Sequence, residues 1–300
     1  MKIIFFATPD FAIPSLKILN ESKHEIVGVV TSPDRQKGRG RKISYSPIKQ
    51  FAVENNLAVL QPEKFKDEEF ISSLKKLDAD LFVIVAFRIL PAEVFTISKL
   101  GSFNLHGSLL PKYRGAAPIQ WAIIKGETQT GATTFFLKEK VDTGNIILQE
   151  KIEIKPEDNF EDLHDSMSEK GAELVLKTVD LIDTENYELR EQDNSKSTPA
   201  PKITKEICRI SWNNSVENMH NLIRGLSPYP GAFFVYDDKH FKIFKSAIVE
   251  NQNLEVGEIQ QTKNELFVGC ENGTLQILEI QAEGRKRMSE EDFNRGFSFR

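Results

Sequence analysis

The stretch KIIFFATPDF at residues 2–11 joins an apolar run to the start of a helix. Residues 2–7 are continuously apolar after Lys2, which predicts a buried parallel strand. Thr8 is then expected as an N-cap and Pro9 as the first helical residue. Residues 2–11 therefore predict a strand that leads directly into a helix.

The same alternation recurs along the first half of the chain. Further strands are predicted at 25–30, 81–85, 102–105, 130–138 and 145–154, and helices at 47–55, 118–125 and 160–182. Strands that alternate with helices indicate an open, mainly parallel sheet covered by helices. The fold class is therefore α/β, with a doubly wound, Rossmann-like N-terminal domain.

The composition changes after Ile182. Residues 184–205 are rich in Glu, Asn, Ser, Thr and Pro, which is typical of a linker. Beyond a helix near 216–224, short strand-like runs separated by turn residues predict a small β-barrel. We therefore expect a catalytic domain at 1–183, a linker at 184–205 and a second domain at 206–300.

Composition and motifs exclude several classes of protein. The formal net charge is −5, and no apolar run is long enough for a membrane span. Pro9 and Asp10 interrupt the N-terminal apolar run, so we expect a cytoplasmic protein rather than a secreted one. Cys208 and Cys270 have no partner spacing, which argues against a disulfide framework or a zinc site. The chain also lacks the glycine-rich motifs of dinucleotide- and ATP-binding loops.

The candidate site follows the predicted strand at 102–105. Asn104 and His106 are two residues apart on an extended chain, so their side chains point to one side. An amide donor beside an imidazole suits an oxyanion site and a proton shuttle. Asp142, in a predicted turn, could orient the His106 ring. Two alternatives remain open at this point: a structural histidine, and an Asx-turn at Asp142.

Longer motifs surround these residues and resemble the formyltransferase family that uses 10-formyltetrahydrofolate. The motifs are Asn104-x-His106-x-Ser108-Leu109-Leu110-Pro111, Tyr113–Gln120 (YRGAAPIQ) and Asp142-Thr143-Gly144. The YRGAAPIQ run, the opening ATPDF and the second-domain stretches KITKE, RISW and RGLSPYPG resemble the branch that formylates methionyl-tRNA rather than the purine-pathway branch. The resemblance covers nearly the whole chain.

The resemblance implies a reaction and its catalytic residues. A formyl group would pass from 10-formyltetrahydrofolate to the amine of initiator methionyl-tRNA, with Asn104, His106 and Asp142 as the catalytic trio. Ser108, Leu109, Leu110 and Pro111 would contact the folate. The second domain would be an oligonucleotide-binding (OB-like) barrel. No metal is expected, and we expect a monomer.

The expected tRNA contacts fall on two basic segments. The loop at 33–42 carries five basic residues against one acidic residue, and a flexible basic loop beside an active site suits a phosphate backbone. The resemblance places an acceptor-stem contact on Arg39, with Arg41 and Lys42 beside it. Residues 184–300, the linker and the second domain together, carry 15 Lys and Arg against 18 Asp and Glu, and only Arg285, Lys286 and Arg287 form a dense basic cluster.

One departure from the family pattern and two rival functions accompany this prediction. Residues 85–91 (VAFRILP) are one residue shorter than the family's common form and have Arg88 where glycine is usual. The nearer rival is a formyltransferase or formyl-folate hydrolase of the same fold that acts on another amine or on water. The other is a folate-responsive RNA-binding protein without catalysis.

Overall fold

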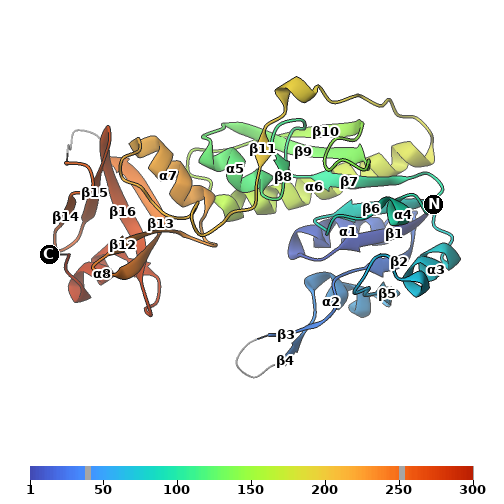
Figure 1. The fold of residues 1–300 in the computed structure, drawn as a ribbon, viewed down its shortest axis with the longest axis horizontal. Helices are drawn as coiled ribbons and strands as arrows, with labels where there is room; N and C mark the ends of the chain where they lie inside the picture. Colours follow the sequence, from blue (N-terminus) through green and yellow to red (C-terminus); the bar gives the residue numbers. More distant parts are fainter. Residues whose placement is uncertain (38–41, 250–253, 300) are drawn as a thin grey trace. The chain divides into compact units, whose positions relative to one another are not determined.

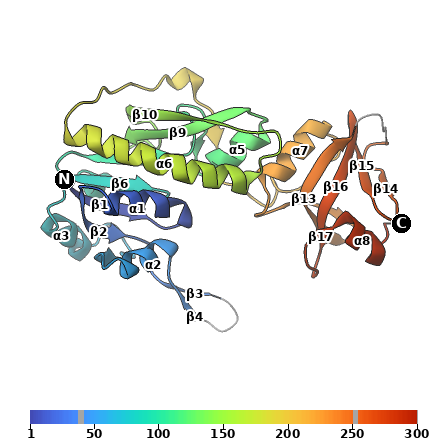
Figure 2. The same ribbon diagram turned by 180° about the vertical axis from the view of Figure 1, so that it is seen from behind.

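The structure is a computed structural model that describes residues 1–37, 42–249 and 254–299. The chain packs into two compact units (Figures 1 and 2). The first comprises Met1–Gly115, Gly131–Ile152 and His164–Pro199, and the second comprises Ala116–Thr130, Glu153–Leu163 and Ala200–Arg300. Among the described residues, no helix has the length and apolar character needed to span a membrane.

The first unit is built on a seven-stranded sheet with the order β10-β9-β7-β6-β1-β2-β5. The strands are β1 (Lys2–Ala7), β2 (Glu25–Val30), β5 (Val59–Leu60), β6 (Leu81–Val85), β7 (Ser102–His106), β9 (Gln129–Phe136) and β10 (Ile146–Glu153). The five strands from β5 to β7 are parallel, and β9 is antiparallel to β7. This confirms the predicted Rossmann-like α/β fold. The strand order reverses direction between β1 and β6, where open α/β sheets bind ligands at the carboxyl ends.

The remaining elements of this unit are helices and short strands. They are η1 (Asp10–Ala12), α1 (Ile13–Asn20), β3 (Arg35–Lys37), β4 (Lys42–Ser44), α2 (Pro47–Glu54), α3 (Glu68–Lys76), α4 (Ala92–Phe95), β8 (Arg114–Gly115), α6 (Phe160–Asp183), η2 (Asn194–Lys196) and β11 (Pro199–Ala200). The first helix starts differently from the prediction. Pro9 is the N-cap of a 3₁₀ turn, and the Thr8 hydroxyl instead pairs with that of Ser32 at 3.0 Å.

The two faces of the sheet are covered by different helices. Phe6, Phe82 and Ile84 pack with Phe70 and Leu74 of α3, and with α4, on one face. On the other face, Gly171 of α6 lies against Leu105 so closely that a Cβ there would be 2.8 Å from the leucine side chain. Residues alternate between faces along β7, so Asn104 and His106 point away from α6.

The second unit contains a curled antiparallel sheet with the order β12-β13-β16-β15-β14, and β17 pairs with β16. The strands are β12 (Ala232–Tyr236), β13 (Lys239–Val249), β14 (Ile259–Gln261), β15 (Leu266–Cys270), β16 (Gly273–Ala282) and β17 (Met288–Ser289), and the helices are α5 (Pro118–Ile124), α7 (Val216–Gly225) and α8 (Glu290–Gly296). Within the described ranges, β12 and β14 form no ladder with each other, so the sheet is a half-barrel.

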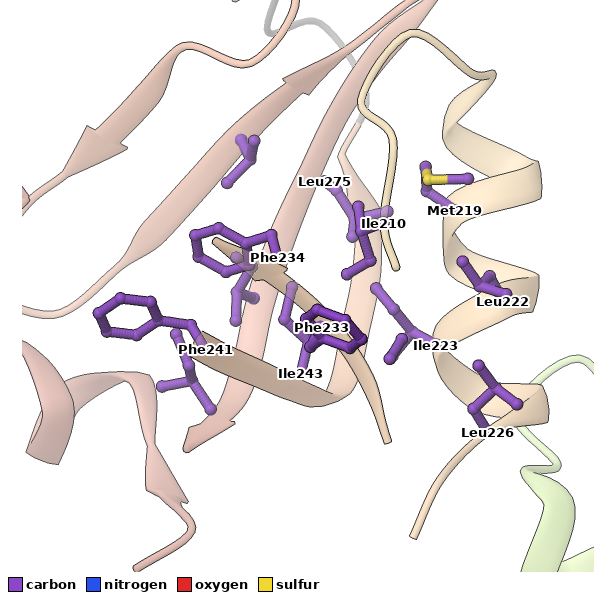
Figure 3. Close-up of a cluster of buried hydrophobic side chains, with 14 of the residues drawn as sticks. Ile210, Met219, Leu222, Ile223, Leu226, Phe233, Phe234, Phe241, Ile243 and Leu275 are labelled. Carbon is purple, nitrogen blue, oxygen red and sulfur yellow. The ribbon is translucent and has the colours of Figure 1, made fainter. Parts of the chain in front are cut away.

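Helix α7 supplies one wall of the core of this unit. Its buried side chains include Met219, Leu222 and Ile223, which face Phe233 and Ile243 of the sheet (Figure 3). Ser215 caps the helix, because its hydroxyl accepts a hydrogen bond from the Asn218 backbone N–H. The apolar face repeats at three- and four-residue spacing, which is the pattern of a helix that buries one side.

Replacing Ile223 with Ala should destabilise the second unit. The side chain is fully buried, so its loss removes packing and leaves a cavity. Such substitutions cost about 2–5 kcal/mol of unfolding free energy. Thermal unfolding followed by circular dichroism measures the change, with the exposed Asn218→Ala on the same helix as control. Equal melting temperatures for the two variants would show that α7 does not support this core.

Candidate active site

The candidate catalytic residues lie at the carboxyl end of β7. Asn104 pairs in register with Ile84 of β6, and His106 is the last residue of its strand. Both residues lie on the sheet face that α6 does not cover. The two residues therefore lie side by side at the strand end, as predicted, next to the switch point between β1 and β6.

The His106 ring is buried and is fixed by a backbone carbonyl. Its Nε2 lies 2.8 Å from the Tyr113 carbonyl oxygen. A carbonyl oxygen can only accept, so Nε2 carries the proton and Nδ1 of the neutral ring has a free lone pair. Tyr113 presents this carbonyl from a left-handed backbone conformation, with φ of 58°. The loop geometry thus selects the tautomer of the ring.

Asp142 completes the pair. Its Oδ2 lies 3.9 Å from Nδ1 of His106 and accepts a hydrogen bond of 2.9 Å from the Gly115 backbone N–H. The first distance is too long for a direct hydrogen bond but short enough for a carboxylate to stabilise a protonated ring. The structure therefore brings the predicted His106 and Asp142 together.

The turn that carries Asp142 tolerates little change. Asp142 itself has a positive φ of 55°, and a Cβ on Gly144 would lie 1.6 Å from the Phe136 carbonyl oxygen. Position 144 therefore requires glycine because of this close approach. Aspartate is among the residues that adopt the left-handed conformation most readily, which suits position 142.

Asn104 is half-buried, and its side chain makes no hydrogen bond to any other residue that the structure describes. The nearby polar side chains of His106, Ser108 and Thr133, in contrast, are hydrogen-bonded to backbone carbonyl oxygens. A half-buried amide without a protein partner is available to a bound molecule. The structure thus leaves an unused donor and acceptor next to the free Nδ1 of His106.

The loop after β7 is shaped by buried hydroxyls. Thr133 of β9 donates to the Ser108 carbonyl oxygen at 2.6 Å and accepts from the Leu110 N–H at 3.1 Å. Gln149 of β10 donates to the Leu110 carbonyl oxygen and to the Thr133 hydroxyl. These contacts hold the loop against the sheet.

The predicted folate residues take different positions in this loop. Ser108 is fully buried, and its hydroxyl donates to the Lys112 carbonyl oxygen at 2.6 Å. Leu110 packs against Phe135 and Ile146, whereas Leu109 and Pro111 are partly exposed. The side chains of Ser108 and Leu110 therefore shape the loop, and Leu109 and Pro111 are the ones open to a ligand.

Arg88 follows β6 at the switch point. Its guanidinium lies over the Phe65 ring, with 4.4 Å between the guanidinium carbon and the ring centroid, and donates to the Pro62 carbonyl oxygen. Partial burial and the charge of Arg35 lower the pKa of Arg88. No carboxylate pairs with Arg88 in the described part of the chain, so this edge keeps its positive charge.

The predicted tRNA contacts are only partly described. Arg39 and Arg41 lie outside the described residues, and of Lys42 only the backbone, in β4, is described. Arg285, Lys286 and Arg287 are exposed between β16 and β17. Arg287 forms an ion pair with Glu279 and lies over the Phe244 ring, so Arg285 and Lys286 are the more available charges of this cluster.

Sequence reasoning missed one residue of the site. Gln192, within the predicted linker, is 9% exposed and hydrogen-bonds to both Arg114 and the turn of Asp142. Burial lowers the pKa of the Arg114 guanidinium, and the negative charge of Asp142 opposes this effect. No group of three or more metal-ligating side chains occurs in the residues described, which exclude 38–41, 250–253 and 300.

Comparison with known proteins shows which family this chain matches. The sequence pattern of the formyl transferase family matches residues 1–179, and that of the formyl transferase C-terminal domain matches residues 202–298. A methionyl-tRNA formyltransferase of Bacteroides thetaiotaomicron is 46% identical, covering 99% of this chain and 96% of the relative. One from Caldanaerobacter subterraneus subsp. tengcongensis is 44% identical, covering 96% of this chain and 94% of the relative.

Solved structures share the fold at low sequence identity. A sugar 3N-formyl transferase superposes with a TM-score of 0.71 at 22% identity, covering 95% of this chain and 99% of its own. A methionyl-tRNA formyltransferase from Clostridium thermocellum has a TM-score of 0.58 at 18% identity, covering 84% and 95% respectively. These matches agree with the two-unit architecture.

The Rossmann-like sheet and the matched domains define a formyl transferase. Because these relatives are 44% and 46% identical over nearly the whole chain, the chain belongs to the methionyl-tRNA formyltransferase family.

Thr133 offers a test of how the loop is held. Thr133→Val has nearly the same shape but removes the hydroxyl, which leaves the Leu110 N–H and Ser108 carbonyl without this partner. Buried groups left unpaired cost about 1–3 kcal/mol each. We expect a lower melting temperature and a raised KM for the folate that this loop is predicted to contact. Thr133→Ser keeps the hydroxyl and should stay close to the unaltered protein. Equal behaviour of the Val and Ser variants would remove the hydroxyl from this account.

Proposed function

We propose that the protein transfers the formyl group of 10-formyltetrahydrofolate to the free amine of initiator methionyl-tRNA, for the initiation of translation. The observation that carries this proposal is Nδ1 of His106, which lies 3.9 Å from Asp142. Beside it is the Asn104 amide, which has no hydrogen-bond partner among the described residues. The family relationship supports the choice of substrates. The reaction is an acyl transfer at the carboxyl edge of the sheet.

The proposed chemistry follows from the tautomer. The methionine amine attacks the formyl carbon on N10 of the folate, and the carbonyl oxygen becomes an oxyanion. Asn104 donates its amide N–H to this oxyanion. His106 accepts a proton from the amine at Nδ1, directly or through a water held by Asp142, and the Asp142 carboxylate stabilises the resulting imidazolium.

The same proton then leaves with the folate. The C–N10 bond breaks, and N10 takes the proton from Nδ1 of His106. In the neutral ring the one N–H is already bonded to Tyr113, so His106 can donate to the oxyanion or the leaving nitrogen only after it has accepted a proton. His106 therefore acts first as base and then as acid.

A folate site at this edge is supported by the side chains that line it. Leu109 and Pro111 present partly exposed apolar surface, and the half-buried Asn104 presents an amide that bonds to no side chain or backbone group in the described ranges. Solved neighbours of the same fold include one in complex with tetrahydrofolic acid and one with 5-N-formyl-tetrahydrofolate. We assign Ser108–Pro111 to the folate site, with Ser108 and Leu110 acting through loop shape.

The tRNA partner is assigned to the basic segments. We propose that Arg39, Arg41 and Lys42 contact the acceptor stem and that Arg285, Lys286 and Arg287 contact the nucleic acid from the second domain. The positive charges of Arg88 and Arg35, which lie close enough for Arg35 to lower the pKa of Arg88, add positive potential at the ligand edge. We further propose a cytoplasmic monomer without a metal, with a catalytic domain at 1–183, a linker at 184–205 and a tRNA-binding domain at 206–300.

The main rival is a transferase that formylates an amino sugar, because solved sugar formyltransferases share the fold. A single-turnover assay separates the two functions. The enzyme is mixed with 10-formyltetrahydrofolate and either charged initiator tRNA, charged elongator tRNA or an amino-sugar nucleotide. Our proposal requires rapid formylation of the initiator tRNA. Formylation of the sugar alone would support the rival, and formate release alone would indicate a hydrolase.

Replacing Asn104, His106 or Asp142 with Ala should lower kcat much more than it weakens folate binding. Each change removes a group that acts on charge developing during the reaction, and the loss of one such group costs on the order of 10² to 10³ in rate. Steady-state kinetics and folate titration measure the two effects. Retention of more than about a tenth of the activity by all three variants would contradict the assignment.

Arg39→Ala should raise the KM for methionyl-tRNA and leave folate binding unchanged. The effect should be larger at low salt, where phosphate contacts contribute most. Arg39→Lys keeps the charge but not the planar fork, so full rescue indicates a simple charge contact. If Arg39→Ala leaves tRNA kinetics unaltered at every salt concentration, the tRNA contact lies elsewhere, with Arg285 and Lys286 as the next residues to replace.

A further inference from the structure

Residues 190–198 hydrogen-bond both to the loop after β7, at residues 113–114, and to the turn that carries Asp142, at residues 142–144. We call residues 190–198 the strap. We propose that the strap positions the His106–Asp142 pair and that Gln192 is its principal positioning residue. The inference rests on the proposed function, because it concerns the same reaction. It assigns a catalytic purpose to a segment whose composition predicts only a linker.

Gln192 bonds to two loops at once. Its Nε2 donates to the Asp142 carbonyl oxygen at 3.0 Å and to the Gly144 carbonyl oxygen at 2.8 Å. Its Oε1 accepts from Nε and Nη2 of Arg114, at 3.1 and 2.6 Å. All four hydrogen-bonding positions of one buried amide are thus directed at the segments that carry the catalytic pair.

The orientation of this amide is determined by its partners. A guanidinium can only donate and a carbonyl oxygen can only accept. A flipped amide would place its NH₂ against Arg114 and its oxygen against two carbonyl oxygens, which would lose every bond. Glutamine is therefore the side chain that satisfies both sides, and the equally long Glu or Met satisfies one side or neither.

The other end of the strap holds the loop that fixes the histidine. The Thr198 hydroxyl accepts from the Tyr113 N–H at 2.9 Å, and the Thr198 carbonyl oxygen accepts from the Arg114 N–H at 2.9 Å. Tyr113 in turn presents its carbonyl oxygen to Nε2 of His106. The strap therefore anchors the residue that selects the tautomer of the ring.

The two anchored loops are also joined to each other. The Gly115 N–H donates to Oδ2 of Asp142, so a shift of either loop moves the carboxylate relative to the ring. Asp142 and Tyr113 both have positive φ, at 55° and 58°. Such conformations persist in non-glycine residues where the surroundings hold them, and the strap supplies these contacts.

Gln192→Met is the direct test, in the full-length protein with 10-formyltetrahydrofolate and charged initiator tRNA. The side chain keeps its length but makes none of the four bonds. We expect kcat to fall by about 10- to 100-fold, because small displacements of catalytic groups have effects of this size. The KM values for both substrates should change by less than about 2-fold, since Gln192 is assigned no ligand contact.

The matched control is Ser98→Ala, at the other end of the same sheet. Ser98 is also buried, and its hydroxyl donates to the Gly101 carbonyl oxygen at 2.6 Å. This variant loses a buried hydrogen bond without touching the strap. It should lower the melting temperature and leave kcat unchanged. An equal loss of kcat in Ser98→Ala would attribute the Gln192 effect to general destabilisation and overturn the proposal.

Gln192→Glu is a second variant that tests the same proposal if Gln192→Met does not fold. Glutamate retains an acceptor for Arg114, with added charge attraction, but places an oxygen against the carbonyls of Asp142 and Gly144. We expect a folded protein with a kcat reduced at least as much as in the Met variant. A Gln192→Glu protein with the kcat of the unaltered chain would overturn the proposal.

A double-mutant cycle with Asp142→Ala decides whether Gln192 acts through Asp142. If it does, Gln192→Met should change the residual rate of Asp142→Ala by less than about 2-fold, because the group being positioned is already absent. Full multiplication of the two effects would contradict the proposal. Failure of the proposed function is distinguishable, since the unaltered protein would then not formylate initiator tRNA at all.

Discussion

The hydrogen bond from Nε2 of His106 to the Tyr113 carbonyl oxygen is the contact on which the site depends. It commits the only N–H of the neutral ring to the backbone and leaves Nδ1 with a free lone pair. In the other tautomer, Nδ1 would carry the proton and could not act as the proposed base. The proposed proton shuttle, the proposed function of Asp142 and the assignment of Asn104 as the first donor to the oxyanion all follow from this bond.

Most polar side chains around the site serve the shape of the backbone. Thr133 and Gln149 hold the loop after β7, Ser108 closes it on itself, and Gln192 ties the Asp142 turn to Arg114. Buried polar groups that are fully bonded in this way make a loop rigid without presenting reactive atoms. Asn104 differs from them, because its amide makes no hydrogen bond within the part of the chain that the structure describes. This difference in hydrogen bonding matches the proposed division between positioning residues and reacting residues.

The sequence allowed the fold to be predicted for physical reasons, whereas the proposed catalytic residues rested on the family resemblance as well as on their spacing. Apolar runs such as residues 2–7 and 81–85 have the length and composition of buried parallel strands, and a two-residue spacing placed Asn104 and His106 on one side. The 3.9 Å approach of Asp142 to His106 was not predictable, because it depends on a turn 36 residues further along the chain. Gln192 was hidden for another reason: its neighbours are exposed and polar, so local composition indicates a linker although this one side chain is buried.

The most direct test of this account is the protonation state of His106 in the resting enzyme. The chain has five histidines, so ¹⁵N-histidine labelling with a His106→Gln spectrum for assignment identifies the ring signals. At a pH where the ring is neutral, we expect the ¹⁵N signals to show a proton on Nε2 and none on Nδ1. A ring that carries its proton on Nδ1 would contradict the assignment of His106 as the base of the transfer.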